Sequence, residues 1–531
     1  MDPVELSLFS SRISAVCEEM GAVLQRTAFS PNIRDRLDFS CAVFDAAGGL
    51  CAQAAHIPVH LGSMAFAMAD LVAAMDWHPG DMVILNDPFM GGTHLPDVTV
   101  VAPVFHGDRL LAFVANRAHH ADIGARSPGS MPVSRSLDEE GLVIPPTRLV
   151  DRGRLDEAVL NLLVGATRNP AQGRGDFAAQ LSANRTGAAR LGELIARMGP
   201  ESFTAAVAAL NDYAERLALE ALSRIPDGHY EFADVMDDDG TGCRDLPVRV
   251  RLAVAGGRVH ADFTGTAAQV PGNVNCPLPV TAAAVYYVFR CLMPPRIPAC
   301  AGAFRPVTLA APEGSLLNAR RPAAVAAGNV ETSTRVVDVI TGALATALPG
   351  EIPAASHGSM NNVAMGGDWQ GAPWDYYETL GGGMGAGPRG GGLSAVQTHM
   401  TNTLNTPIEV LEERYPLRVT RYAVRRGSGG AGQRRGGDGL VREFRFLAPA
   451  TVTLITERRR HRPWGLAGGG PGAAGDNRLN GRPLPGKVQV EVAAGDTLTI
   501  ATPGGGGWGH PRSPAPGGHP QPPAPSSQPP A

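Results

Sequence analysis

Two adjacent runs of β-forming residues place the strongest constraint on what this chain can fold into. Residues 98–105 (VTVVAPVF) and 110–116 (LLAFVAN) are almost wholly apolar, and the segment His106-Gly107-Asp108-Arg109 separates them. Two such runs joined by a short glycine-containing turn predict an antiparallel hairpin that turns about the Gly-Asp pair. If the strands pair outward from that turn, the sequence numbers of two facing residues add up to about 215. Asp97 should therefore lie opposite Ala118.

This hairpin would bring together polar side chains that are about 25 residues apart in the chain. His94 and Asp97 come just before the first strand, and His119, His120 and Asp122 come at the end of the second. Imidazole and carboxylate ligands suit Mn, Zn, Fe or Ni, and a metal held there could activate water or polarise a carbonyl. The alternative is a hydrogen-bonded polar cluster at a strand end. The sequence therefore predicts one of these two at this end of the hairpin.

Two more groups of polar residues near the N-terminus have both a functional and a structural explanation. His56 and His60 lie four residues apart around Pro58, where we expect extended backbone, so they could be ligands, substrate contacts or structural histidines. Asp35 and Asp38 alternate with arginines, which is also typical of a surface run of ion pairs.

A glycine-rich region from about residue 320 to 445 contains further candidates for substrate contacts. Asn329, Glu331 and Thr332 precede an apolar run, so they could cap a helix or hold a substrate. His399 lies in THMTNT (398–403), where small and polar residues would let the backbone approach a ligand. The GxGxxG match within 427–432 lacks the strand and helix context of a dinucleotide site.

Lysine is almost absent from the chain, and this excludes one common kind of phosphate-binding site. Lys487 is the one lysine among 46 basic residues, and the net charge is −4. A P-loop requires Ser or Thr after its lysine, but Val488 follows here, so the motif is missing. The charge also gives no broad basic field for nucleic acid or anionic lipid.

The cysteines and the N-terminus indicate a cytoplasmic protein. The seven cysteines are scattered without a CxxC pair, which favours a reducing compartment. No basic leader precedes an apolar segment at the N-terminus, and no apolar run reaches 18 residues.

Helical and strand patterns both recur along the 531 residues, which predicts an α+β protein. We expect a large mixed architecture of several layers, with β-hairpins and antiparallel sheets, flanking helices and Gly-rich loops. We expect an N-terminal α+β region with the metal site (1–225), a C-terminal β-rich and Gly-rich region (226–512) and a disordered Pro-rich tail (513–531). Helical patterns cover 4–26, 61–75, 155–222 and 280–292, and strand patterns cover 40–44, 50–54, 82–85, 230–235, 248–255 and 259–263.

Ten long segments carry a family resemblance. They are SPNIRDRLDFSCAVFD (30–45), HIPVHLGSM (56–64), NDPFMGGTHLPDVTVVAPVF (86–105), ANRAHHADIG (115–124), EEGLVIPP (139–146), GNVETSTRVVD (328–338), YYETLGGGMGA (376–386), THMTNTLNTP (398–407), GSGGAGQRRGGDGLVR (427–442) and TPGGGGWG (502–509). In this order, they resemble the hydantoinase B / 5-oxoprolinase family, which includes N-methylhydantoinase B subunits and subunits of acetone and acetophenone carboxylases.

The resemblance implies a B-type subunit in the ATP-dependent hydrolytic opening of a cyclic amide, a hydantoin or 5-oxoproline. An A-type partner with an actin-like ATPase fold would phosphorylate the substrate, in agreement with the missing P-loop. His94, Asp97 and His119 match the family's divalent-metal pattern (Mn, Zn or Fe), and Asp35 or Asp38 would complete it. Asn329, Glu331, Thr332 and His399 would bind substrate, and His120 or Asp122 would assist proton transfer.

Two positions depart from the family pattern, and two other functions stay open. Related sequences often have Glu where Asp35 stands, and Gln397 replaces a histidine expected before THM. The chain could instead be a subunit of an ATP-dependent ketone carboxylase, or a scaffold that only shapes the active site of its partner.

Overall fold

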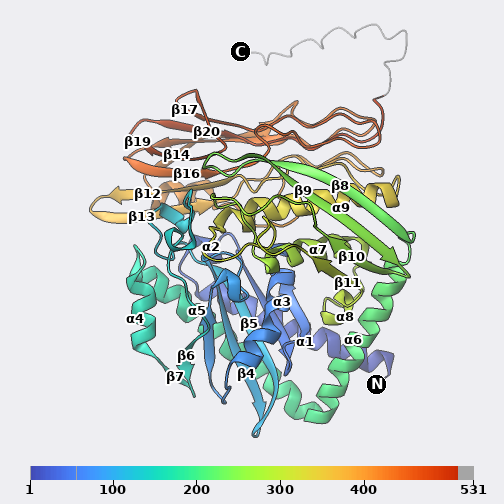
Figure 1. Ribbon diagram of the computed structural model, residues 1–531. Coiled ribbons are helices and arrows are strands. Elements are labelled where there is room, and N and C mark those ends of the chain that lie inside the picture. The colour runs from blue at the N-terminus through green and yellow to red at the C-terminus, as the bar shows by residue number, and fades with distance from the viewer. Residues whose placement is uncertain (1, 56, 512–531) are drawn as a thin grey trace, which may run out of the picture.

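The computed structural model describes residues 2–55 and 57–511 (Figure 1). Helices and mostly antiparallel sheets form several layers, which confirms the predicted α+β class. His56 and the tail predicted for residues 513–531 lie outside the described residues. Within the described residues, no helix has the length and apolar character needed to cross a membrane.

The predicted hairpin forms the middle of a seven-stranded N-terminal sheet. Its strands lie in the order β2-β1-β5-β4-β3-β6-β7, and all neighbouring pairs are antiparallel. The strands are β1 (Phe39–Asp45), β2 (Leu50–Ala55), β3 (Met82–Leu85), β4 (Asp97–His106), β5 (Arg109–His119), β6 (Thr147–Asp151) and β7 (Arg154–Leu155).

The register of this hairpin differs by one residue from the prediction. Beside the turn Phe105 pairs with Leu110, as expected, but Val104 pairs with Ala112 because Leu111 is an extra, bulged residue. From there to the end of the strands every pair is displaced by one. Asp97 consequently lies opposite His119 rather than Ala118.

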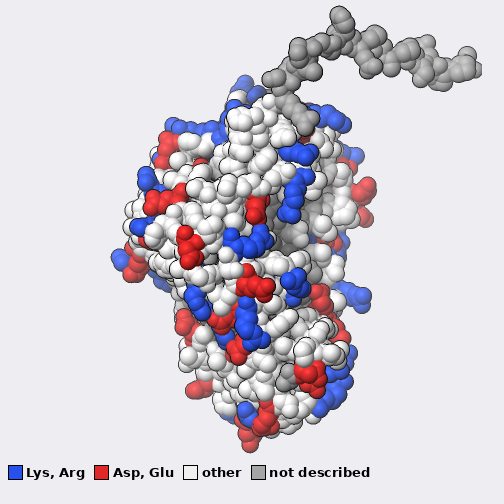
Figure 2. Space-filling model, turned by 90° about the vertical axis from the view of Figure 1, so that its right-hand side faces the viewer, with Lys and Arg blue, Asp and Glu red and all other residues white. Residues whose placement is uncertain are grey.

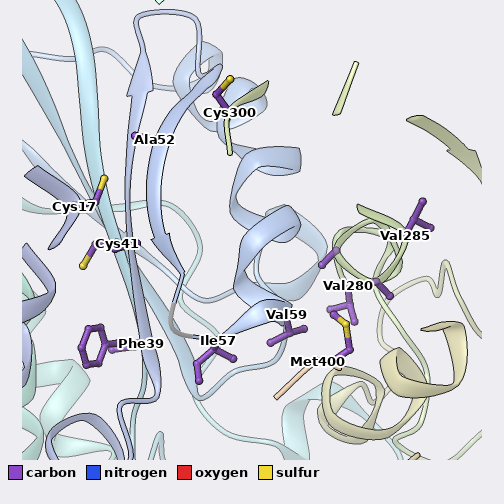
Figure 3. Packing of buried hydrophobic residues seen from close by; sticks show 14 of the residues in the cluster. Cys17, Phe39, Cys41, Ala52, Ile57, Val59, Val280, Val285, Cys300 and Met400 are labelled. Atoms are coloured by element: carbon purple, nitrogen blue, oxygen red, sulfur yellow. The ribbon is translucent and has the colours of Figure 1, made fainter. Parts of the chain in front are cut away.

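Helices cover both faces of this sheet. α1 (Pro3–Thr27) and α5 (Pro170–Met198) cover one face, and α3 (Pro58–Ala74) covers the other and contacts α7 (Leu278–Leu292). Figure 3 shows apolar side chains from the β1–β2 hairpin, α3 and α7 in one cluster, which Met400 joins from the C-terminal half. The remaining N-terminal helices are α2 (Pro31–Arg34), α4 (Glu157–Gly165) and α6 (Pro200–Leu222).

The start of α3 corrects one local expectation. We predicted extended backbone around Pro58 and a helix from residue 61, but α3 begins at Pro58 itself. Proline is well suited to the first helical position because its φ is already fixed and its missing N–H would have no partner there. His60 is therefore in the first turn of the helix.

The C-terminal half adds three smaller sheets and α9. The sheet β11-β10-β9-β8 packs against α9, and two further sheets, β13-β12-β16-β19 and β14-β15-β20-β17-β18, lie beyond it at the top of Figure 1. The elements are β8 (Gly228–Asp238), β9 (Arg244–Ala255), β10 (Arg258–Asp262), α8 (Ala301–Phe304), β11 (Val307–Ala310), α9 (Ser333–Ala347), β12 (Asn362–Trp369), β13 (Ala372–Glu378), α10 (Ile408–Arg414), β14 (Leu417–Arg425), β15 (Gly439–Phe446), β16 (Ala450–Ile455), β17 (Asp476–Leu479), β18 (Arg482–Leu484), β19 (Lys487–Val492) and β20 (Thr497–Ala501).

The boundary that we predicted near residue 225 falls between α6 and β8. The largest hydrophobic cluster nevertheless runs from Phe9 to Ile455 and takes in residues on both sides of that point. The two-region division stays a prediction, and the two regions share one core.

Charged side chains are buried where the C-terminal sheets meet α9. Lys487 is 4% exposed, and its Nζ lies 2.6 Å from Oε1 of Glu457. Arg335 of α9 contacts the other oxygen of Glu457 at 3.2 Å and Asp234 of β8 at 3.1 Å. Buried charges are stable only when they are paired, so this network fixes β8, α9 and β19 relative to one another. On the outer surface seen in Figure 2, by contrast, cations and anions are interspersed among wide uncharged areas.

Glycines let irregular segments of the C-terminal half come into direct backbone contact. Gly505 donates to the carbonyl of Gly437 at 2.9 Å, and Gly437 donates to that of Met384 at 2.9 Å. A Cβ atom on Gly505 would lie 2.1 Å from the carbonyl oxygen of Met384. Only glycine therefore fits at such positions. This requirement explains why the glycine runs show neither a helical nor a strand pattern in the sequence.

We predict opposite effects for two glycine-to-alanine substitutions. Gly505→Ala should lower the stability by about 1–3 kcal/mol, because backbone must move to admit the methyl group. Gly192→Ala in α5, where a Cβ meets nothing within 4 Å, should instead raise it by about 0.5–1 kcal/mol. Thermal denaturation of both variants measures the effects. A Gly505→Ala protein as stable as the wild type would contradict the close packing.

Candidate metal centre

The end of the β4–β5 hairpin carries a compact group of possible metal ligands. Asp97 and His119 face each other across the ladder, and His94 precedes them in the loop that enters β4. One ligand atom from each of the three lies within 4.8 Å of the others, and the side chains are at most 3% exposed. In the described part of the chain, no other group of His, Cys and acidic residues meets this geometry.

Each imidazole is held through one nitrogen, which leaves the other nitrogen without a hydrogen-bond partner. Nδ1 of His94 lies 3.3 Å from the carbonyl oxygen of Ala326, and Nδ1 of His119 lies 3.1 Å from the Asn32 amide. Both Nε2 atoms are buried without a hydrogen bond, and Nε2 of His94 lies 3.3 Å from Oδ1 of Asp97. An outer partner on one ring nitrogen is the usual support of a metal-binding histidine. For His119 to bind a metal through Nε2, its Nδ1 must carry the proton and donate it to an oxygen. This requires the Asn32 side-chain amide to be flipped, so that its oxygen rather than its nitrogen faces Nδ1.

Asp97 is the anionic centre of the group. Its Oδ2 accepts hydrogen bonds from the Thr93 hydroxyl at 2.5 Å and the Asn329 amide at 3.3 Å, and it lies 3.4 Å from Nε2 of His60. Burial alone would raise the pKa of Asp97, but His94 and His60 outweigh it and the pKa falls well below the usual value. The carboxylate is therefore ionised, as a metal ligand must be. His60 belongs to this group, whereas His56 lies outside the described residues.

The two acids that the sequence left open occupy different environments. Asp38 is 6% exposed, its backbone carbonyl accepts the His119 N–H at 3.0 Å, and its carboxylate interacts electrostatically with Asp97. Burial raises the pKa of Asp38. Asp35 instead forms an ion pair with Arg34 at 2.8 Å. Neither carboxylate belongs to the set of ligand atoms within 4.8 Å of one another, but Asp38, which also lies 3.8 Å from Arg36, is the one that interacts with Asp97 and His94.

Arg36 and Tyr377 form a wall of the site that we did not predict. The Tyr377 ring lies parallel to that of His119, with 4.9 Å between their centroids. Arg36 is fully buried and donates from Nη1 to the backbone carbonyl of Tyr377 at 2.8 Å. Tyr377 belongs to the segment YYETLGGGMGA (376–386), in which we predicted no site residue. This contact brings the C-terminal half of the chain onto the N-terminal hairpin.

Glu140, also missed, supports the segment that holds His94. Its Oε1 accepts the backbone N–H groups of Val325 and Ala326 at 2.9 and 3.0 Å and the Ser134 hydroxyl at 2.7 Å. The Ala326 carbonyl is the partner of His94 Nδ1, so Glu140 positions that carbonyl. Burial raises the pKa of Glu140 to about 7. Its place in the motif EEGLVIPP was the available signal.

The four predicted substrate contacts do not all meet at the centre. Asn329 reaches Asp97, and Glu331 lies two residues further along the same π-helical turn, Gly328–Thr332. Thr332 is the N-cap residue of α9, but its hydroxyl donates to the Val274 carbonyl at 2.5 Å instead of making a capping hydrogen bond. Nδ1 of His399 lies 3.5 Å from the Tyr287 hydroxyl, in another contact network. The Asn329 and Glu331 roles keep a structural basis, and the other two stay predictions.

His120 and Asp122, the predicted proton-transfer groups, bind other parts of the structure. Nε2 of His120 lies 2.9 Å from Oε1 of Gln180 in α5. Asp122 accepts the Ser130 hydroxyl at 2.8 Å and the Arg168 backbone N–H at 2.6 Å. These contacts join the loop after β5 to α5 and to the turn that precedes it, and they give the proton-transfer role no support.

A cleft of about 680 Å³ lies beside the segment that leads into His94. Residues 88–91, which lead into His94, form one wall, and Arg320 and Arg321 form part of another. An ion pair between Arg321 and Asp87 connects the two walls.

Comparison with known proteins places this chain in a family. The 5-oxoprolinase 1 of Arabidopsis thaliana is 41% identical over 542 residues, a match that covers 96% of this chain but 42% of the plant protein. The putative B-type subunit of a D-/L-hydantoinase from a Pseudomonas strain is 33% identical, with 96% of this chain and 90% of that one covered.

A solved structure gives the same result. The ATP-dependent caprolactamase from Pseudomonas jessenii superposes with a TM-score of 0.90 at 28% identity, covering 96% of this chain and 91% of that one. The Hydantoinase B/oxoprolinase family matches residues 2–511, and the chain belongs to this family.

Proposed function

We propose that this chain is the B-type subunit of an ATP-dependent cyclic amidohydrolase, which opens a hydantoin or 5-oxoproline ring after a partner subunit has activated it. The observation that carries this proposal is the buried group His94, Asp97 and His119, whose ligand atoms lie within 4.8 Å of one another and in which neither Nε2 atom makes a hydrogen bond. The names of its relatives, a 5-oxoprolinase, a B-type hydantoinase subunit and a caprolactamase, supply the reaction class.

The residues present suit a divalent ion such as Mn, Zn or Fe. His94, Asp97 and His119 would hold it, with Asp38 as the fourth ligand, because mixed imidazole and carboxylate donors are what these ions take. When bound, such an ion supplies a Lewis acid for water or for the ring carbonyl. The chain's own residues fix the geometry: Asn32 and the Ala326 carbonyl orient the imidazoles, and Tyr377 closes one side against water.

The environment of Lys487 supports assigning ATP to an A-type partner ATPase. A P-loop lysine must reach phosphate oxygens, whereas Lys487 is buried and pairs with Glu457 at 2.6 Å. The partner subunit would then phosphorylate the ring, and this chain would act in a hetero-oligomer. The cytoplasm is the proposed location, since all seven cysteines are unpaired thiols.

The proposed reaction predicts ring opening by the pair of subunits without bicarbonate. Co-purified with an A-type ATPase subunit, the chain should open 5-oxoproline or hydantoin with matching ATP consumption. His94→Ala and Asp97→Ala should each lower this rate by at least about 100-fold, because each removes a ligand. Full activity in both variants would rule out the site, and an absolute requirement for bicarbonate and a ketone would favour a carboxylase.

Metal content gives a test that does not depend on activity. Purified wild-type chain should contain near-stoichiometric divalent metal by elemental mass spectrometry, and His94→Ala should lose it. His229→Ala is the matched control, because His229 is exposed on β8. A wild-type protein without metal after purification in metal-supplemented buffer would contradict the proposal.

A pair of isosteric variants distinguishes the two candidate acids. Asp38→Asn should weaken metal binding at least about tenfold, as expected when a ligand or its immediate support loses its charge. Asp35→Asn should leave the affinity unchanged, because Asp35 pairs with Arg34 instead. Competition with a chelator measures both affinities. The reverse order of effects would assign the site to Asp35.

A further inference from the structure

The cleft beside the segment that carries His94 is large enough to hold a small molecule. Its volume is about 680 Å³, and small-molecule sites in proteins usually occupy roughly 300–1,000 Å³. Residues 88–91, part of α3, the start of α7 and the segment that contains Glu313 and Arg320 form its walls. None of the proposed metal ligands lines it, so the cleft is a separate space next to the metal centre.

Two walls of the cleft continue into the metal centre. Residues 88–91 come shortly before His94 in the chain. The opposite wall continues from Arg321 to Ala326, whose carbonyl oxygen lies 3.3 Å from Nδ1 of His94. An ion pair between Arg321 and Asp87 also joins these two segments. A ligand in the cleft would therefore lie between the two segments that together position His94.

Part of the cleft wall is apolar and open to solvent. Phe66 of α3 is 39% exposed, Met90 is 47% exposed, and both line the cleft. Leu71 and Phe89 extend the same surface. Large apolar side chains that stay exposed together in a concave surface are typical of binding sites. This part of the cleft suits the ring of a small molecule.

Two adjacent arginines provide the polar part of the wall. Nε of Arg320 lies 2.8 Å from Oε1 of Glu313, and Arg321 pairs with Asp87 through Nη2. A guanidinium has five N–H groups, and the others on these two side chains have no hydrogen-bond partner in the described chain. Their planar shape matches the oxygens of a phosphoryl group. Asp70 and Glu313 also line the cleft, so direct hydrogen bonds, and not an overall positive field, would hold an anion here.

A buried positive charge lies behind the same wall. Arg117 is 1% exposed, and its Nη2 donates to the carbonyl of Gly91 at 2.9 Å. The other fully buried arginines among the described residues each have a carboxylate within 3.8 Å, whereas Arg117 has no ion pair there. Its charge interacts with Asp97, which His60 and His94 already share. Because an uncompensated buried charge is costly, an anion bound against this wall would be stabilised.

We propose that this cleft binds the phosphorylated cyclic amide that the partner subunit produces, an inference that rests on the proposed function. Arg320 and Arg321 hold the phosphoryl group, and Phe66 and Met90 contact the ring. This ligand carries a charged group next to an apolar ring, and the cleft offers a wall for each. The arginines favour the activated amide over the neutral one, so the substrate kept beside the metal centre is the one that has consumed ATP.

Binding of phenylphosphonate to the purified chain tests this site. The probe joins an aromatic ring to a phosphoryl group through a C–P bond that does not hydrolyse. In calorimetric titration, the wild type should bind it at least about tenfold more tightly than inorganic phosphate, because the probe also contacts the apolar wall. Arg320→Gln should weaken probe binding about tenfold, the loss expected for one charge-assisted hydrogen bond. Phe66→Ala should weaken binding of the probe but not of inorganic phosphate.

Arg224→Gln is the matched control. Arg224 is also half-exposed and paired with a glutamate, Glu351, but it lies outside the cleft. This variant should bind the probe as the wild type does. Combined with the partner subunit, Arg320→Gln should consume more ATP per ring opened than the wild type, because the activated amide dissociates before its ring opens. Arg224→Gln should keep the wild-type ratio.

The possible failures are distinguishable. Equal probe binding by the wild type and Arg320→Gln, with an unchanged ATP ratio, would overturn the cleft assignment and leave the proposed function intact. A Phe66→Ala chain that binds the probe normally but no longer co-purifies with its partner would identify the cleft as a subunit contact instead. Absence of ring opening in the wild-type pair, with metal and probe both bound normally in separate titrations, would overturn the proposed function and with it the identity of the ligand.

Discussion

The pairing of β4 with β5 is the constraint on which the rest of this structure depends. These strands form the middle of the N-terminal sheet, α5 and α3 pack on its two faces, and the ends of the strands carry the candidate site. The bulge at Leu111 shifts the ladder by one residue, and this shift places Asp97 opposite His119. Without it, Ala118 would face Asp97 and the imidazole would point to the other side of the sheet.

Burial of polar groups imposes the second constraint, because each buried charge needs a partner inside the protein. At the site, Arg36 meets this need by donating a hydrogen bond to the backbone carbonyl of Tyr377. This hydrogen bond joins the two halves of the chain in addition to their apolar contacts. Lys487 and Arg335 do the same around Glu457, on the far side of α9. The π-helical turn Gly328–Thr332 interacts with both regions, through the hydrogen bond from Asn329 to Asp97 and through the electrostatic interaction of Glu331 with Glu457 and Lys487.

Local sequence patterns predicted the helices, the hairpins and the residues at the end of β4 and β5, since all of these depend on short-range periodicity and turn chemistry. They could not predict the bulge, because no residue type marks Leu111 as the extra one. Asn32, Arg36, Glu140 and Tyr377 were missed for another reason. Each acts through a contact with a residue distant in the chain, such as the 341 positions between Arg36 and Tyr377, and spacing carries no information about such pairs. The glycine segments gave no signal because their partners are backbone atoms.

The structure also bears on the two explanations that the sequence left open for the His/Asp group. A purely structural polar cluster lowers its free energy by satisfying its own donors and acceptors, and most of the buried histidines and amides around the site do so. His60 contacts Ser40 and Asp97 through its two nitrogens. His94 likewise contacts the protein through both nitrogens, because its Nε2 lies 3.3 Å from Oδ1 of Asp97. His119 differs, because its Nδ1 meets Asn32 and its buried Nε2 has no partner. Three ligand atoms that converge within 4.8 Å around an ionised carboxylate suit a cation, and this convergence is what supports a metal centre.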